Sequence, residues 1–220
     1  YIKYPNRENA KGMLKSFDKV LSFDKNDSKA FGLEFLPLFY IPQYEEIAKG
    51  DVPQKYDLMF AGTVHSERYE FVNGIVNQIK DKGGSCFTWF YFPSKVNFYK
   101  LKWDNKNFRS ANIKDFQFQP MSREKLLGYY AESRIQIDMQ HPKQTGLTMR
   151  TIETLGAKKK LITTNPDVVN YDFYRPENIL VVDRQRPVIT KEFLETPWID
   201  IPEEIYKKYS ISSWLNTIFK

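Results

Sequence analysis

The chain has 220 residues, of which 41% are hydrophobic and 27% charged, so it can bury a sizeable core and is neither fibrous nor disordered. It contains no run of eighteen apolar residues and no basic-then-apolar leader, which argues against a spanning helix or a signal peptide and favours the cytoplasm. One cysteine and two histidines exclude a disulfide framework and zinc-site spacing, so we expect no metal. The net charge of +6 is dispersed among 27 acidic residues, which indicates a solvated surface and not a nucleic-acid stripe, so we expect no nucleic-acid partner.

The chain order of apolar runs and turn residues predicts two units. Residues 17–40 are typical of a strand, a short helix closed by Gly32 and a second strand. Pro42, Gly50 and Pro53 punctuate the polar residues 43–55, which predicts a connection between two lobes. From residue 56 onward, strands alternate with amphipathic helices, which favours a parallel sheet with helices on both faces. The expected strands cover residues 56–64, 85–92, 116–118, 134–139, 159–164 and 178–183.

Two strand-to-helix junctions are candidate ligand sites, because open parallel sheets bind ligands outside the carboxyl ends of their strands. The first junction runs from Gly62 to Arg68, and Arg68 can point back toward the cleft from the start of the following helix. The second junction covers residues 140–148 and includes His141, which could donate to a phosphate or to a sugar hydroxyl. A helix-surface arginine and a loop histidine without a task remain alternatives.

The stretch QTGLTMRTIE, residues 144–153, has the residue types that a nucleotide diphosphate needs. Gly146 lets the backbone approach a ligand closely, and Leu147 and Thr148 can offer N–H groups at the positive end of a helix dipole. Arg150 and Glu153 lie four and seven residues beyond Gly146 and hence on one helical face. A carboxylate there can accept both vicinal hydroxyls of a ribose. The alternative is that these two side chains form an exposed intrahelical pair.

With these residues identified, the order of elements resembles the carboxyl-terminal half of a GT-B glycosyltransferase. The segment SREKLLGYYAESRIQIDMQHPKQTGLTMRTIETLGAKKKLITTN is similar to the donor-binding run of that family, and YDLMFAGTVHSERYEFVNGI resembles the segment that opens the same lobe. The likeness is greatest to CgeB-like proteins and to glycosyltransferases of bacterial polysaccharide (LPS and capsule) biosynthesis. It covers residues 17–219 and is most specific over 122–165.

This resemblance implies an α/β fold with a Rossmann-like parallel sheet and a remnant of the amino-terminal lobe. Residues 1–45 would end the acceptor lobe, 55–190 would form the nucleotide-sugar donor-binding domain, and 191–220 would be helices that pack back on the lobes. Because the first residue is Tyr1, we expect a processed product or a piece of a longer chain, with most of the acceptor lobe outside it.

The resemblance also implies roles for individual residues. Glu153 would bind the ribose of the donor, and Arg150 and Arg68 would neutralise its diphosphate. Gly146, Leu147 and Thr148 would face the diphosphate, and Gly62, His141 and Thr145 are further candidates for donor binding. Thr145 stands where many retaining members carry a glutamate, a departure that leaves the stereochemistry open.

The expected function is therefore transfer of a sugar from a nucleotide-sugar to a glycan or lipid-linked acceptor, without a metal or any cofactor beyond the donor itself. We expect the isolated chain to bind nucleotide but to turn over poorly, with His141 as the candidate catalytic residue. Peripheral contact with the inner face of the membrane is left open. Two alternatives remain: a non-catalytic module that binds a nucleotide or a protein, and a sugar-nucleotide epimerase or hydrolase of the same fold.

Overall fold

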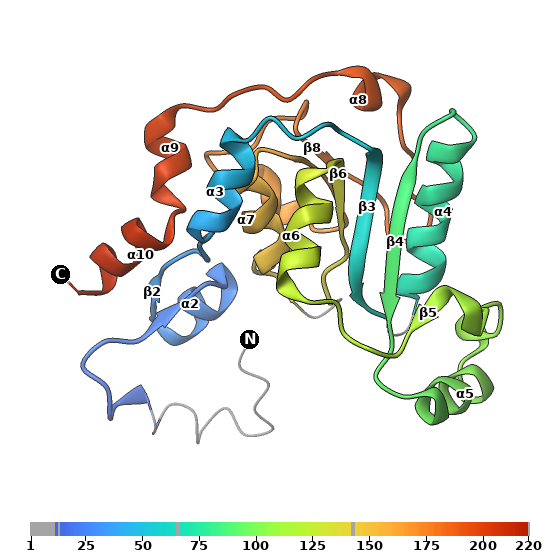
Figure 1. The fold of residues 1–220 in the computed structure, drawn as a ribbon. Coiled ribbons are helices and arrows are strands. Elements are labelled where there is room, and N and C mark those ends of the chain that lie inside the picture. The colour runs from blue at the N-terminus through green and yellow to red at the C-terminus, as the bar shows by residue number, and fades with distance from the viewer. Residues whose placement is uncertain (1–11, 13, 65–66, 142–143, 220) are drawn as a thin grey trace.

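A parallel sheet forms the centre of the fold. The computed structural model describes residues 12, 14–64, 67–141 and 144–219 (Figure 1). Within them, six strands pair in parallel in the order β5-β4-β3-β6-β7-β8. The strands are β3 (Tyr56–Thr63), β4 (Cys86–Tyr91), β5 (Phe116–Gln117), β6 (Ser133–Asp138), β7 (Lys160–Thr163) and β8 (Ile179–Val181). Each of the strands expected from the sequence is present.

The central strand β3 shows why the sheet carries helices on both faces. Leu58 and Phe60 are buried in one hydrophobic cluster, whereas Met59 and Ala61 are buried in a second. Successive side chains of a strand point to opposite faces, so each cluster lies on its own face of the sheet. Parallel strands also require crossover segments, which here are the covering helices. The predicted Rossmann-like α/β architecture is confirmed.

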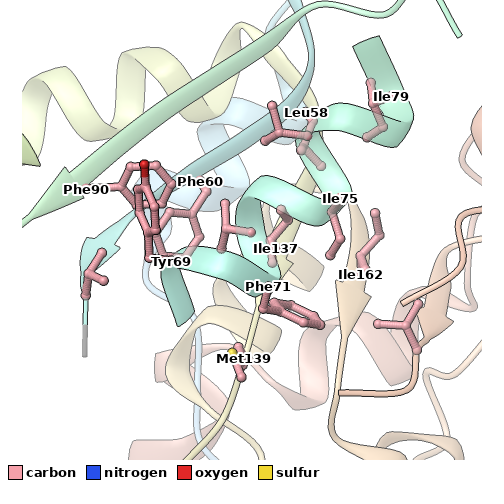
Figure 2. Packing of buried hydrophobic residues seen from close by; sticks show 14 of the residues in the cluster. Leu58, Phe60, Tyr69, Phe71, Ile75, Ile79, Phe90, Ile137, Met139 and Ile162 are labelled. Atoms are coloured by element: carbon pink, nitrogen blue, oxygen red, sulfur yellow. The ribbon is translucent and has the colours of Figure 1, made fainter. Parts of the chain in front are cut away.

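One face is covered by α4 (Arg68–Lys80). Its side chains Phe71, Ile75 and Ile79 recur at four-residue spacing, and all three are buried. Figure 2 shows them against strand residues of the same cluster, among them Ile137 and Ile162. Burying each of these side chains contributes about 1.5–3 kcal/mol, which fixes α4 and its amino end relative to the strand ends.

The other face is covered by α3 (Pro42–Lys49), α6 (Arg123–Ala131) and α7 (Met149–Gly156). Tyr44 of α3 and Tyr130 of α6 are buried with their ring centroids 5.3 Å apart. The reading of residues 43–55 as a bare polar connection is therefore wrong for its first part. Pro42 occupies the first turn of a helix, where a proline is well tolerated, and does not interrupt one.

The amino-terminal residues form the predicted strand, helix and strand. The two strands pair with each other in a small sheet that is separate from the main one. They are β1 (Leu21–Ser22), α2 (Lys25–Phe31) and β2 (Glu34–Phe35), with β1 and β2 parallel. Gly32 ends α2 in the left-handed region, at φ 66°. The remaining helices are α5 (Lys95–Asp104), α8 (Lys191–Glu195), α9 (Glu203–Lys208) and α10 (Ile211–Ile218), with 3-10 turns at Lys106–Phe108, Ile113–Asp115 and Pro166–Asn170.

The carboxyl-terminal helices pack back on the centre of the chain. The amide of Tyr40 donates to the carbonyl of Tyr209 at 2.8 Å, and the hydroxyl of Tyr206 donates to the carbonyl of Gly156 in α7 at 2.6 Å. A Cβ on Gly156 would lie 2.5 Å from the Tyr40 ring, so only glycine lets α7 approach this closely. These contacts join the end of the amino-terminal unit, α7 and α9.

Candidate functional site

The sheet reverses its winding between β3 and β6. From β3 the chain continues outward to β4 and β5, whereas from β6 it continues in the opposite direction to β7 and β8. Neighbouring strands whose connections leave in opposite directions open a crevice at their carboxyl ends, and open α/β sheets bind ligands there. The two junctions singled out in the sequence follow these two strands, so the fold brings them together at one crevice.

Arg68, the first residue of α4, joins the two sides of this crevice. Its guanidinium donates to the carbonyl of Thr63 at 2.8 Å and to that of Met139 at 2.7 Å. Its Nε is buried and has no hydrogen-bond partner among the described residues. Burial and the positive charges of Arg150 and Arg184 lower the pKa of Arg68 to about 10, so it stays charged at neutral pH.

Arg150 reaches the same crevice from α7. It donates to the carbonyl of Ile137 at 3.1 Å and to that of Ala61, while its guanidinium carbon lies 5.3 Å from the centre of the Phe60 ring. A Cβ on Gly62 would lie 3.3 Å from Nη2 of Arg150. Gly62 therefore provides space for this arginine at the end of β3, in addition to any contact with a ligand.

A third arginine, Arg184, was missed by the sequence analysis. It follows β8, donates to the carbonyl of Gln140 at 2.6 Å, and forms an ion pair with Glu67 at 2.9 Å. Its only signal in the sequence was its position just after a predicted parallel strand, where ligand-binding residues gather. Arg68, Arg150 and Arg184 together place three guanidinium groups at the carboxyl edge of the sheet.

The buried carboxyl group of Asp138 faces these arginines at the end of β6, and the sequence analysis did not single it out. It accepts from the hydroxyls of Thr148 at 2.9 Å and Thr151 at 3.4 Å. Burial raises the pKa of Asp138, although Arg150, Thr148 and Arg68 act to lower it. Asp138 thus ties the start of α7 to the end of β6.

The start of α7 differs from the expectation. The helix begins at Met149, and the side chain of Thr148 caps it by accepting from the amide of Thr151. Leu147 is buried in the second hydrophobic cluster, so its side chain anchors the loop and does not face a ligand. The roles of the Leu147 and Thr148 amides toward a phosphate remain predictions.

Glu153 lies one turn into α7 on the same face as Arg150. Both side chains are half-buried, which contradicts the alternative of an exposed intrahelical pair. Burial raises the pKa of the Glu153 carboxyl, while Arg150 and a hydrogen bond from the hydroxyl of Tyr44 act to lower it. A carboxylate with neighbouring donors is thus held inside the fold beside the arginines.

The loop before α7 contacts the amino-terminal unit. Asp24, another residue that the sequence analysis missed, accepts from the Gly146 amide at 2.8 Å and from the Thr145 hydroxyl at 2.6 Å. A Cβ on Gly146 would lie 3.0 Å from the ring of Phe23. The close backbone approach that Gly146 permits is therefore to residues 23–24, and its amide already has a carboxylate acceptor.

The carboxylate of Asp24 also caps α2 by accepting from the amides of Asn26 at 2.9 Å and Asp27 at 3.2 Å. Burial acts to raise its pKa, but the hydrogen bonds from Thr145, Gly146 and these two amides outweigh burial and hold it below the ordinary value. Asp24 is therefore the side chain that joins the start of α2 to the loop before α7.

A pocket of about 360 Å³ opens beside this loop. It lies between the start of α2 and the carboxyl ends of β6 and β7, and its lining residues include Lys25, Asn26, Gln140, Gln144, Thr145 and Asn165. His141, which follows the lining residue Gln140 in the sequence, is half-buried, and its carbonyl accepts from the amide of Gln144 at 2.8 Å. Residues 65–66 and 142–143, which belong to the two junctions, lie outside the described residues.

A larger cavity, about 600 Å³, lies at the opposite edge of the sheet near Asp57, Gly84 and Arg134. Because these residues stand at or before the amino ends of β3, β4 and β6, this cavity is remote from the reversal point of the strand connections. Among all the described residues, no cluster of three His, Cys, Asp or Glu side chains is arranged to hold a metal ion. None of the described helices has the length and apolar character needed to span a bilayer.

Comparison with solved structures identifies the architecture. A glycosyltransferase from Rickettsia africae ESF-5 matches 98% of this chain with a TM-score of 0.58 and 12% identity. Anabaena Alr3699/HepE, solved in complex with UDP and glucose, matches 96% with a TM-score of 0.59 and 9% identity. The chain spans 66% and 65% of the lengths of these two structures. No family model and no curated protein matches the sequence.

The fold is thus one found in glycosyltransferases of the GT-B type. At such low identity the likeness establishes the shared architecture. The closer kinship with CgeB-like and LPS or capsule enzymes, the division of the chain into lobes and the roles of the site residues stay predictions.

Proposed function

We propose that this chain is the donor-binding portion of a glycosyltransferase and binds the nucleotide of a nucleotide-sugar between the ends of β3 and β6. The sugar would pass to a glycan or lipid-linked acceptor in bacterial surface polysaccharide synthesis, a choice of acceptor that rests on the sequence resemblance of residues 122–165. The enzyme would act in the cytoplasm or at the inner face of the membrane.

The observation that carries the proposal is the set of guanidinium groups at the reversal point. Among the described residues, Arg68 and Arg150 donate only to backbone carbonyls, and no carboxylate lies within ion-pair distance of either guanidinium. Two cations fixed in advance attract a diphosphate and need little reorganisation when it binds. A diphosphate whose developing negative charge is stabilised by cations already in position is also a better leaving group.

The position of Glu153 favours a nucleotide over a simple phosphate as the ligand of this site. Its carboxylate lies on the same helical face as Arg150, one turn further from the start of α7. A ribose attached to a diphosphate at the arginines would present two neighbouring hydroxyls in that direction, and the two carboxylate oxygens can accept both. Gly62 and the loop of residues 140–148 would complete the walls of the site.

In the proposed reaction, the acceptor oxygen forms a bond to the anomeric carbon of the sugar. The bond from that carbon to the diphosphate breaks, its electron pair stays on the diphosphate, and the acceptor hydroxyl gives up its proton to the departing diphosphate or to solvent. Arg68, Arg150 and the amino end of α7 would hold the negative charge that develops on the diphosphate. No metal or further cofactor is assigned a role. His141, which follows the pocket-lining residue Gln140, is the candidate for contact with the transferred sugar.

Calorimetric titration tests the proposal. We expect the chain to bind at least one of UDP, GDP, ADP and CMP. Replacing Arg68 with glutamine should weaken nucleoside diphosphate binding by about tenfold or more, because a charge-assisted contact contributes about 1.5–3 kcal/mol. Glu153→Ala should weaken it several-fold. The matched control is Arg186→Gln, because Arg186 is exposed and lies two residues beyond Arg184.

A glycosyltransferase, a protein-interaction module and an epimerase or hydrolase would give different experimental results. A folded chain without affinity for any of these nucleotides contradicts the proposal and favours a protein-interaction module. Consumption of a nucleotide-sugar in the absence of an acceptor would favour the epimerase or hydrolase alternative. Equal loss of affinity in Arg68→Gln and Arg186→Gln would show that Arg68 acts only through overall charge.

A further inference from the structure

The helix α5 (Lys95–Asp104) has an apolar face that is covered by no other element of the described chain. Its side chains Val96, Tyr99 and Trp103 are 77%, 58% and 84% exposed. Their spacing of three and four residues places them on one side of the helix. The opposite side already packs into the core through Phe98, which is fully buried. The outward face is therefore not needed to hold α5 in the fold.

This face is surrounded by positive charge. Lys95 and Lys100 flank the apolar side chains on the helix, and Lys106 and Arg109 follow in the next turn. Residues 94–114 contain six Lys and Arg residues and a single acid, Asp104. Among the described residues, none of the acidic side chains pairs with Lys100, Lys106 or Arg109. The charge of this segment thus remains available to a partner.

The position of α5 allows it to reach a flat surface. The helix begins four residues after the end of β4, at the carboxyl edge of the sheet that also holds the arginines. Figure 1 shows α5 projecting beyond the ends of the strands, away from the layers of the main body. A protruding helix can reach a flat bilayer surface, whereas single-stranded nucleic acid is held in grooves.

We propose that the outward face of α5 docks on an anionic lipid bilayer. Helices that lie in a membrane interface combine a polar face rich in lysine with an aromatic and aliphatic face, and Trp and Tyr favour the headgroup level. Lysine is depleted in protein interfaces, which argues against a protein partner for this face. Two copies of the chain would bring like charges together, which argues against self-association.

Docking would hold the carboxyl edge of the sheet close to lipid. Each lysine or arginine near an anionic surface adds to the attraction, and the attraction fades within a Debye length. Insertion of Trp103 adds the burial of an aromatic side chain. This inference is independent of nucleotide binding, because no residue of α5 belongs to the candidate site.

Vesicle sedimentation tests the inference with the full chain. At about 0.1 M salt, we expect binding to vesicles with about 30% phosphatidylglycerol to be at least tenfold tighter than to pure phosphatidylcholine. The double variant Lys100→Glu/Lys106→Glu should lose about tenfold or more of this binding. Val96→Ser/Trp103→Ser should lose several-fold, and Trp103 fluorescence, obtained by subtracting the Trp103→Phe protein, should shift to the blue when anionic vesicles are added.

The control variant Lys29→Glu/Lys80→Glu makes the same change in charge at exposed positions outside α5. It should bind anionic vesicles within about twofold of the unaltered chain. Equal losses in the two lysine variants, unchanged binding after Val96→Ser/Trp103→Ser, or no binding to anionic vesicles would each overturn the inference. If the α5 variants still bind nucleotide, a negative result in the vesicle experiment does not contradict the proposed function.

Discussion

Arg68 and Arg150 bind backbone carbonyls at the ends of β3 and β6, and this arrangement has two consequences at the scale of single residues. The carbonyl oxygens fix the positions of the guanidinium groups. They do not cancel the positive charge as a carboxylate would. Burial lowers the pKa of Arg68 most, and the nearby positive charges of Arg150 and Arg184 lower it further. An anion between them would relieve that repulsion.

The pKa of Glu153 provides a prediction about pH. Burial raises this pKa above its ordinary value of 4.5, so the group takes up a proton at a higher pH than a free carboxyl does. The protonated form can no longer accept from both ribose hydroxyls. We therefore expect the affinity ratio between the unaltered chain and Glu153→Gln to be several-fold at pH 7.5 and to fall toward one as the pH falls through the raised pKa.

Calorimetry with one nucleoside diphosphate over this pH range measures the ratio. Protonation of the phosphate affects both proteins equally, so the comparison isolates Glu153. A ratio that stays constant with pH would contradict contact between the ionised carboxylate and the ribose.

Some residues of the candidate site could be identified from the sequence, and others could not. Arg150 and Glu153 stood out because helical spacing is a local property. Arg184 and Asp24 could not be recognised, because their contacts depend on the order of strands in the sheet and on the packing of the amino-terminal unit. Gly146 was recognised as a site of close approach, but the sequence could not reveal that Phe23 and Asp24 approach it.

At the scale of elements, the loop before α7 is anchored along its last four residues. Leu147 is buried in the core and Asp138 holds Thr148, the N-cap of the helix that begins at Met149. Directly before these residues, Thr145 and Gly146 are held by Asp24. This loop therefore couples the amino-terminal unit to the candidate site.

Asp24→Asn isolates this coupling. Asparagine can still cap α2 through Oδ1, but an amide in place of Oδ2 cannot accept from the Gly146 amide. We expect the free energy of unfolding to fall by about 1–3 kcal/mol at pH 7. Because the pKa of Asp24 lies below its ordinary value, this stabilisation is present at neutral pH and is lost as the pH falls through the lowered pKa.

Urea unfolding followed by circular dichroism measures the change. Asp18→Asn is the control, because Asp18 is an exposed acid near the same helix. Equal stabilities of Asp18→Asn and Asp24→Asn would contradict the contact between residue 24 and the loop.

At the scale of the whole molecule, the sequence was sufficient to predict the sheet, because its strands are short apolar runs separated by amphipathic helices. The strand order, and with it the meeting of the two junctions, follows from packing between distant segments. The helix α3 was missed because Pro42 was taken as an interruption. Its buried Tyr44 reaches Glu153, so the helix that was missed also forms part of the candidate site.

The central claim is that a nucleotide diphosphate binds between the carboxyl ends of β3 and β6. A crystal structure of the chain with a saturating nucleoside diphosphate or nucleotide-sugar tests it most directly. We expect phosphate oxygens at about 3 Å from the guanidinium groups of Arg68 or Arg150, with the ribose toward Glu153. An empty crevice at saturation, or a nucleotide bound instead in the cavity beside Asp57 and Arg134, would contradict it.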